Sequence, residues 1–242
     1  TISGMMLGFQ EFIVYQLVNN DSHIRISARE DSLTEHVLDD AFFSNAGKKT
    51  PEVSWIRPPS GRTSNTYIMN PSEWYTTLEQ NKDVDAHSPQ LVAQVIARNG
   101  KVSTTARIIG VDVGKQIRVT NISSYMKIGH FEDIAGGGNR ILCGEGLLNK
   151  LGANPPQSIL LSVGSGPPQP FKIVGTFNLG VKSLDDTTFF ATLTDVQRLN
   201  ETPSRISDIA VRLHDVKKAE GIADMWSALS TDKVQSWNQF NE

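Results

Sequence analysis

The sequence contains a single cysteine, Cys143, among 242 residues. One cysteine cannot form a disulfide within the chain or a thiolate metal cluster. No apolar run reaches the roughly 18 residues that a membrane-spanning helix needs. The N-terminus also lacks a basic region followed by an apolar stretch, so we expect no signal peptide there. These absences argue against a disulfide scaffold, a cysteine-ligated metal centre and a membrane-spanning segment within this sequence.

Clusters of positive charge are also missing. The 23 basic and 26 acidic residues give a net charge of −3, and no run of lysine or arginine occurs. Because nucleic-acid-binding proteins normally carry a basic stripe, nucleic acid is not an expected partner. The hydrophobic fraction of 38% is ordinary for a globular protein and sufficient for a sizeable core. The length favours one body with two subdomains.

The apolar patterns predict an α+β fold. The pair Asn99-Gly100 between two apolar runs predicts a β-hairpin with strands near 94–98 and 102–111, because both residues tolerate positive φ. Further predicted strands are 23–27, 66–69, 140–143, 158–163, 171–177, 187–193, 208–213 and 233–237. Predicted helices are 1–18, 35–43, a segment carrying Trp74 and Leu78, 145–151, 194–199 and 215–229. Residues 81–89 are polar and predict a loop.

Two helix starts and one helix end have recognisable signals. Thr194 and Gln197 have the spacing of a capping box, in which the glutamine side chain reaches back to the cap residue. Asp215 precedes a run with Ala219, Trp226 and Leu229 on one face, and is predicted to cap that helix. Gly152 is predicted to end the helix over 145–151.

The sequence gives little support for catalysis or cofactor binding. Gly136-Gly137-Gly138 lacks the Gly-Lys-Ser/Thr of a phosphate-binding loop. The five histidines have no zinc-site spacing, and the cluster His130 to Asp133 favours a solvated loop over a metal site. For Cys143, a small buried side chain is favoured over a role as a nucleophile. The pairs Asp39-Asp40 and Asp185-Asp186 should point apart. We predict no catalytic residue, no metal and no cofactor, with a soluble α+β enzyme kept as a minor alternative.

A loop rich in proline and glycine joins the strands predicted at 158–163 and 171–177. It runs from Gly164 to Pro170 and contains three prolines and two glycines. Prolines have no N–H to pair and resist inclusion in a sheet, so the loop should project and be semi-rigid. It is either a plain hairpin tip or a preorganised arm for contact with another protein.

The sequence begins and ends abruptly. The helical pattern of residues 1–18 starts without an acidic first turn, and residues 237–242 stop without a helix terminator. Two interpretations are open. These are ordinary chain ends, or the chain is a soluble segment between two membrane helices.

The order of several short motifs resembles a known family. The motifs are Ser3–Phe9, His23–Ile26, Ser88–Leu91, Ile109–Asp112, Ile141–Leu147 followed by Leu151-Gly152, and Phe171–Phe177. Together they resemble the MacB-like periplasmic core domain of ABC transporter permeases, and within it the lipoprotein-releasing permeases of the LolC/LolE type. The resemblance covers nearly the whole chain.

The resemblance implies a domain between the first and second membrane helices of a permease in the inner membrane, facing the periplasm. It implies an N-terminal helix (1–20) continuing from a membrane helix, and a Porter-like α/β layer (21–114 and 174–242). A β-rich Sabre-like subdomain (115–173) is inserted between the two parts of that layer. Implied partners are a cytoplasmic ABC ATPase, reached through membrane helices, a second permease copy or paralogue, and a periplasmic lipoprotein carrier.

The resemblance also assigns roles to two sets of residues. In lipoprotein-releasing permeases a hook before the Phe-x-Val-x-Gly-x-Phe motif engages the carrier; here it is shorter than in the family pattern. The implied hook residues are Ser162, Gly164, Ser165, Gly166, Pro167, Pro168, Gln169 and Pro170. The implied cargo-path residues are Met5, Met6, Phe9, Phe12 and Ile13. The function expected is ATP-driven release of an amphipathic cargo, with efflux or mechanical signalling as the alternative.

Overall fold

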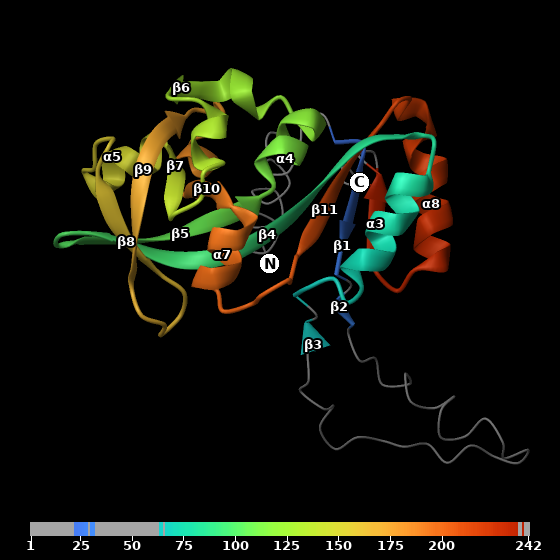
Figure 1. The fold of residues 1–242 in the computed structure, drawn as a ribbon, viewed down its shortest axis with the longest axis horizontal. Helices are drawn as coiled ribbons and strands as arrows, with labels where there is room; N and C mark the ends of the chain where they lie inside the picture. Colours follow the sequence, from blue (N-terminus) through green and yellow to red (C-terminus); the bar gives the residue numbers. More distant parts are fainter. Residues whose placement is uncertain (1–21, 29, 32–62, 65, 237–238, 240–242) are drawn as a thin grey trace, which may run out of the picture.

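The computed structural model describes residues 22–28, 30–31, 63–64, 66–236 and 239. Ten strands form one sheet in the order β12-β1-β11-β4-β5-β10-β7-β9-β6, and β8 pairs with both β4 and β9. Helices pack on this sheet (Figure 1). The predicted α+β class is therefore confirmed. The helices predicted over 1–20 and 35–43 lie outside the described residues.

The strands of the large sheet are β1 (Ile24–Ser27), β4 (Val84–Asn99), β5 (Val102–Val111), β6 (Met126–Ile128), β7 (Arg140–Gly144), β8 (Ser158–Ser162), β9 (Gln169–Phe177), β10 (Thr188–Thr192), β11 (Asp208–Leu213) and β12 (Lys233–Ser236). Strands β2 (Glu30–Asp31) and β3 (Thr63–Ser64) pair separately. The helices are α3 (Pro71–Gln80), α4 (Val113–Val119), α5 (Glu145–Leu151), α6 (Lys182–Asp185), α7 (Leu193–Leu199) and α8 (Ala219–Leu229). Short 3-10 helices span Ile122–Tyr125, Phe131–Ile134 and Val216–Lys218.

Six of the strands close into a barrel. Following the pairs from β4 through β5, β10, β7, β9 and β8 leads back to β4. Together with α4, α5, α7 and β6 these strands form the barrel lobe, on the left of Figure 1. Closure removes the exposed strand edges that an open sheet of these strands would have. The sequence patterns did not predict this closure.

The remaining strands form a second part, the helix-covered lobe, on the right of Figure 1. It comprises β12, β1, β11 and the first half of β4, with α3 and α8 beside them. Strand β4 joins the two lobes, because its residues 84–90 pair with β11 and its residues 96–98 pair with β8. The two lobes thus share one long strand rather than a flexible linker.

Each lobe has its own apolar core. Inward-facing residues of the barrel strands, which alternate with period two, form one cluster with residues of α5 and α7; it includes Val95, Ile108, Leu161, Phe171 and Phe189. The outer face of β5, β7, β9 and β10 is covered by a second cluster that includes Phe131, Phe177 and Phe190. The helix-covered lobe has a third, which includes Ile26, Trp74, Val211 and Trp226.

Two predictions of local structure were wrong. Residues 81–89 were predicted as a loop, but β4 begins at Val84. Pro89 is tolerated there because β5 pairing begins only at Gln90, so that Pro89 has a strand partner on one side alone. Residues 66–69 were predicted as a strand but form bends. Ile68 is nevertheless buried and its N–H donates to the carbonyl of Ile206 at 3.0 Å.

The helix over 194–199 begins earlier than predicted. Thr192, not Thr194, is its N-cap, and the Thr192 hydroxyl accepts a bond from the Asp195 N–H at 3.2 Å. Gln197 does not reach back to the cap, because its amide donates to the Arg205 carbonyl at 2.8 Å. The predicted cap by Asp215 is confirmed for the 3-10 helix that leads into α8. Gly152 ends α5 in the left-handed conformation, as predicted.

The barrel lobe draws strands from all three predicted subdomain segments. Strands β4 and β5 lie in 21–114, β7 and β8 lie in 115–173, and β10 lies in 174–242. Strand β9 crosses the boundary between 173 and 174. The division into Porter-like and Sabre-like segments stays a prediction.

Candidate partner-binding surfaces

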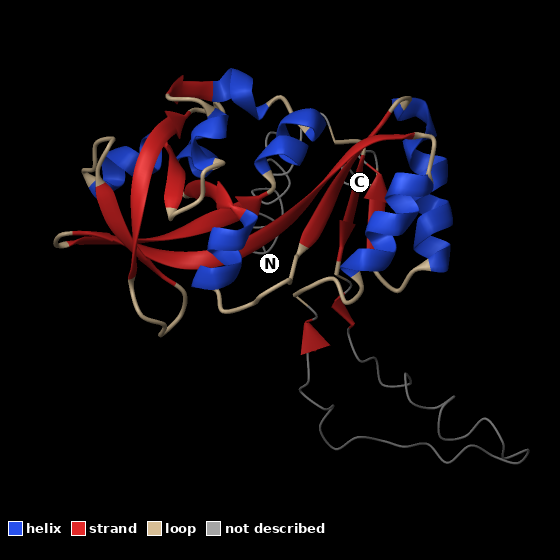
Figure 2. Cartoon of the chain, in the orientation of Figure 1, coloured by secondary structure: helices blue, strands red, loops and turns tan. Residues whose placement is uncertain are grey.

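The predicted hook residues run from the last residue of β8, Ser162, through the connecting turn to the first two residues of β9, Gln169 and Pro170. Strand pairing in this hairpin ends at Leu161 opposite Gln169, and the loop beyond it extends from the barrel (Figure 2). The N–H of Gly166 donates to the Val163 carbonyl at 2.9 Å, and Gly164 has a φ of +51°, which suits glycine. Ser165, Pro167 and Pro168 are exposed. The structure thus brings the predicted residues together in one projecting loop.

A third strand holds the base of this loop. Strand β4 pairs with β8, placing Ile96 opposite Ser162 and Arg98 opposite Leu160. On the other side of β8, Leu160 lies opposite Pro170 of β9. Because directly opposed residues share a face, Arg98, Leu160 and Pro170 form an exposed row beside the loop. The loop and this row make a continuous surface of apolar and basic character.

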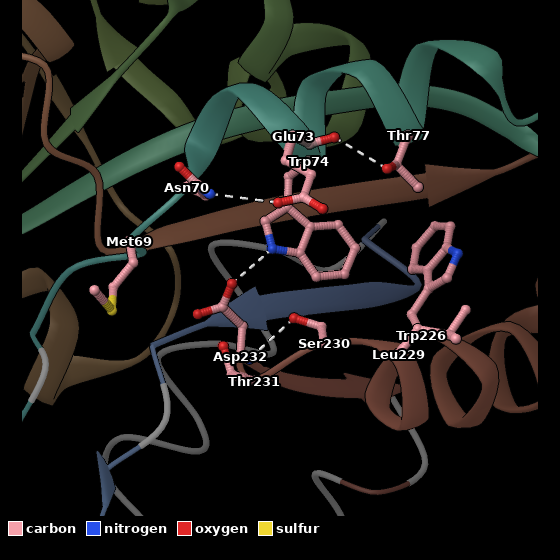
Figure 3. A pocket seen from close by; sticks show the side chains of 10 residues that line it. All are labelled: Met69, Asn70, Glu73, Trp74, Thr77, Trp226, Leu229, Ser230, Thr231 and Asp232. Atoms are coloured by element: carbon pink, nitrogen blue, oxygen red, sulfur yellow. Dashed lines mark hydrogen bonds between the residues drawn. The ribbon is translucent and has the colours of Figure 1, made fainter.

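A second candidate surface lies in the helix-covered lobe, where sequence reasoning predicted none. A cavity of about 570 Å³ opens between α3 and the end of α8 (Figure 3). Its floor contains Trp74 and Trp226, whose rings meet edge to face with centroids 5.8 Å apart. Trp74 Nε1 donates to Asp232 Oδ2 at 2.7 Å. We call this cavity and its rim the α3–α8 groove.

The rim of the α3–α8 groove is apolar and acidic. Met69 is 72% exposed and Leu229 is 81% exposed. The amphipathic pattern predicted Leu229 on one face of the helix with Ala219 and Trp226. Those two residues are buried, whereas Leu229 is exposed because it is the last residue of α8. Two carboxylates, Glu73 and Asp232, line the groove, and among the described residues that line it there is no lysine or arginine. The sequence signal that could have indicated this site is Leu229, an apolar residue at the end of an amphipathic helical pattern.

The glycine-rich loop does not provide a phosphate site. A cavity of about 520 Å³ lies between this loop and the starts of α4 and α7. Asp195 in its wall is buried, pairs with Arg198 at 2.5 Å and accepts the Asn139 N–H at 3.3 Å. A carboxylate in this place repels phosphate and leaves the arginine already neutralised. The glycines serve the turn before β7.

The remaining titratable candidates have structural roles. Cys143 is buried, and burial raises the pKa of its thiol far above the usual range.

Asp185 accepts the Leu179 N–H at 2.8 Å, whereas Asp186 pairs with Lys150 at 3.1 Å and Lys182 at 3.2 Å. His130 and Asp133 cap a 3-10 helix. Among the described residues, no group of three or more His, Cys, Asp or Glu side chains could hold a metal ion.

Two further sets of predicted residues lie outside the described residues. They are the cargo-path residues Met5, Met6, Phe9, Phe12 and Ile13, and the carboxylate pair Asp39-Asp40. No helix in the described part of the chain is long and apolar enough to cross a membrane.

The sequence profile of one family, the MacB-like periplasmic core domain, matches residues 1–229. The chain belongs to this family. It is therefore a periplasm-facing part of an ABC transporter permease, and permeases of this family work as dimers with a cytoplasmic ABC ATPase. The family is one of transporter permease domains and not a known enzyme class. A search of curated proteins gives no match.

Solved structures support the fold. The periplasmic region of MacB from Actinobacillus actinomycetemcomitans is similar with a TM-score of 0.57 and 12% identity, over 94% of each chain. The extracellular domain of the noncanonical ABC-type transporter YknZ from Gram-positive bacteria has a TM-score of 0.50 and 14% identity, over 71% of this chain and 90% of that one. At these identities the likeness concerns the fold alone.

Proposed function

We propose that this domain belongs to a permease of the lipoprotein-releasing type, in which ATP hydrolysis in the cytoplasm drives extraction of an amphipathic cargo. In this proposal the loop from Ser162 to Pro170 binds a soluble periplasmic lipoprotein carrier. The observation that supports it is the loop itself. It projects from the end of β8, and β8 is paired with β4 on one side and with β9 on the other.

The chemistry of the loop supports protein contact. Pro167 and Pro168 are exposed and restrict the backbone before any partner binds, so that less conformational entropy is lost on binding. Leu160 and Ile96 are exposed apolar side chains next to the loop. Arg98 on β4 and Lys172 on β9 are exposed as well. A carrier with an apolar patch and acidic neighbours would fit this surface.

The alternative is a MacB-like efflux or mechanotransmission permease. The short loop favours this second candidate, because an arm of this length offers fewer contacts than the family hook. In that case the loop is a structural hairpin tip, and the domain passes motion or cargo without a dedicated carrier.

Site-specific photo-crosslinking separates the two candidates. A photoreactive residue at Ser165 or Gln169 of the full-length permease, in native envelopes, should crosslink to a soluble periplasmic protein that carries acylated lipoproteins. Ser123, exposed in another part of the barrel lobe, is the matched control position and should give no such product. Crosslinks only to a neighbouring permease copy, or none at all, would favour efflux or mechanical signalling.

A second experiment tests the rigidity of the arm. Replacing Pro167 and Pro168 by glycine frees the loop backbone without removing a buried side chain. We expect the carrier crosslink from Ser165 to fall while the thermal stability of the domain changes little. A crosslink of undiminished yield would show that preorganisation by the prolines is not used.

The same proposal gives the N-terminal segment a place on the cargo path. Met5, Met6, Phe9, Phe12 and Ile13 are large and adaptable apolar side chains suited to acyl groups. Replacing Phe9 and Phe12 by serine in the full-length permease should lower lipoprotein release. Unchanged release would exclude a cargo role for these two residues.

A further inference from the structure

The α3–α8 groove has no function in the proposal above, yet it combines features of a binding site. Its two exposed rim residues, Met69 and Leu229, leave apolar surface in water, which is costly unless another surface covers it. Glu73 and Asp232 line it, and no lysine or arginine is found among its described lining residues. This acidity disfavours anionic lipid headgroups and favours an occupant with apolar and basic side chains.

The tip of the β4–β5 hairpin has the complementary chemistry. Val102 is 44% exposed at the tip, and the exposed Arg98 and Lys101 flank it. In the described part of the chain neither Arg98 nor Lys101 forms an ion pair. The tip therefore presents one apolar side chain between two cations that form no ion pair with any described carboxylate.

The hairpin tip is also rigid. Strand pairing continues to Asn99 opposite Val102, and Gly100 has the positive φ of +58° that the turn requires. The Asn99 amide donates to the carbonyl of Leu151 at 3.0 Å, which ties the turn to the end of α5. Gln157 donates to Asn99 Oδ1 at 3.0 Å. A tip fixed in this way loses little entropy when it binds.

We propose that the β4–β5 tip of one chain binds in the α3–α8 groove of a second copy, with Val102 against Leu229 and Met69, and Lys101 facing Glu73. Tip and groove lie in different lobes, toward opposite ends of the long axis (Figure 1). Two copies related by a two-fold axis make this contact twice, so the assembly closes as a dimer. The inference goes beyond the carrier-binding proposal and shares only Arg98 with it; the residues placed in the contact, Val102 and Lys101 on the tip and the rim of the groove, are not used there.

Disulfide trapping tests the contact directly. The chain's one native cysteine, Cys143, is buried, so introduced thiols dominate the reaction. The full-length permease with Val102→Cys and Leu229→Cys should form a covalent dimer on mild oxidation in native envelopes. The matched control joins Val102→Cys with Val216→Cys, because Val216 is an apolar residue that is 42% exposed but lies before α8, outside the groove. Because docking raises the local thiol concentration, we expect about tenfold more dimer from the first pair.

A charge exchange provides the second measurement. Lys101→Glu and Glu73→Lys each place like charges together in the proposed contact, and each should lower the dimer yield about fivefold. Combining the two substitutions in one chain should restore the yield, since the pair is then opposite in sign again. Rescue of this kind does not arise from a folding defect.

Three results would overturn the proposal. They are equal dimer yields from the Val216 control, no dimer from either pair, and a Leu229→Cys product that contains a different protein instead of a second copy. None of them bears on the carrier crosslink from Ser165, so failure here is distinguishable from failure of the proposed function.

Discussion

Trp74 on α3 and Asp232 before β12 are joined by a hydrogen bond of 2.7 Å between the indole Nε1 and the carboxylate Oδ2. The two residues are far apart in sequence, and Trp74 is buried. Their bond fixes α3 against the segment that follows α8, and so fixes the two walls of the α3–α8 groove.

The first prediction concerns this bond. Asp232→Ala leaves the indole N–H of Trp74 without its acceptor, and we expect a loss of about 1 to 2 kcal/mol in the free energy of unfolding. Asp232→Asn keeps an acceptor oxygen and should lose less. Urea unfolding of the 242-residue chain, followed by circular dichroism, measures both. Equal stability of Asp232→Ala and the unmodified chain would mean that water replaces the carboxylate without cost.

Local signals in the sequence predicted many of the elements. Asn99-Gly100 predicted the hairpin, although only Gly100 adopts positive φ there and Asn99 is the last paired residue of β4; the positive φ of Gly152 likewise marked the end of α5. These signals depend only on neighbouring residues. The start of β4 was missed because Asp85 and Pro89 interrupt its apolar pattern, while the pairing that stabilises it comes from β11, more than a hundred residues later.

Long-range relationships were not predictable in this way. Barrel closure depends on three pairs between residues 96–98 and 160–162, which no local pattern encodes. The candidate loop was found because proline and glycine alter the backbone directly. The α3–α8 groove was missed because it forms from the end of α8, the start of α3 and the turn at Asp232, which meet only in the folded chain.

The second prediction concerns the close approach of α7 to β5. A Cβ added at Gly110 would lie 2.8 Å from the Val196 Cβ and 3.2 Å from the Leu193 Cα. We therefore expect Gly110→Ala to destabilise the chain by about 1 to 3 kcal/mol through overpacking. Gly221→Ala is the matched control, since Gly221 lies in α8 with no atom within 4 Å of an added Cβ. It should stabilise by about 0.5 to 1 kcal/mol. A Gly110→Ala variant as stable as the control would contradict the packing described.

The third prediction concerns Cys143. Burial in the barrel raises the pKa of its thiol, so little thiolate forms at neutral pH, and reagents cannot reach the sulfur. Ellman's reagent should not modify the folded chain, and should modify one thiol per chain in denaturant. Rapid modification of the folded chain at neutral pH would reopen the nucleophile interpretation.

The fourth prediction concerns His87 on β4, where the two lobes meet. Its ring stacks on Tyr75 of α3, and its Nε2 lies 3.4 Å from Lys115 Nζ of α4. Burial and the positive charge of Lys115 lower the pKa of His87 below its ordinary value of 6.5, with Arg118 acting in the same direction and Glu79 and Asp112 opposing. The folded state therefore favours the neutral ring. The stabilisation of the folded state by the neutral His87 ring is present above pH 6.5. It is lost as the pH falls through the lowered pKa of His87.

Comparing two variants across pH isolates the effect of His87. His87→Phe keeps a ring to stack on Tyr75 but cannot take a proton, so the stability advantage of the unmodified chain over this variant should shrink as the pH falls below about 6.5. Lys115→Gln removes the nearest positive charge and should make the loss on acidification smaller. Chemical unfolding at several pH values between 5 and 8 gives both comparisons. Curves for the unmodified chain and His87→Phe that run parallel over this range would show that protonation of His87 does not weaken the junction of the lobes.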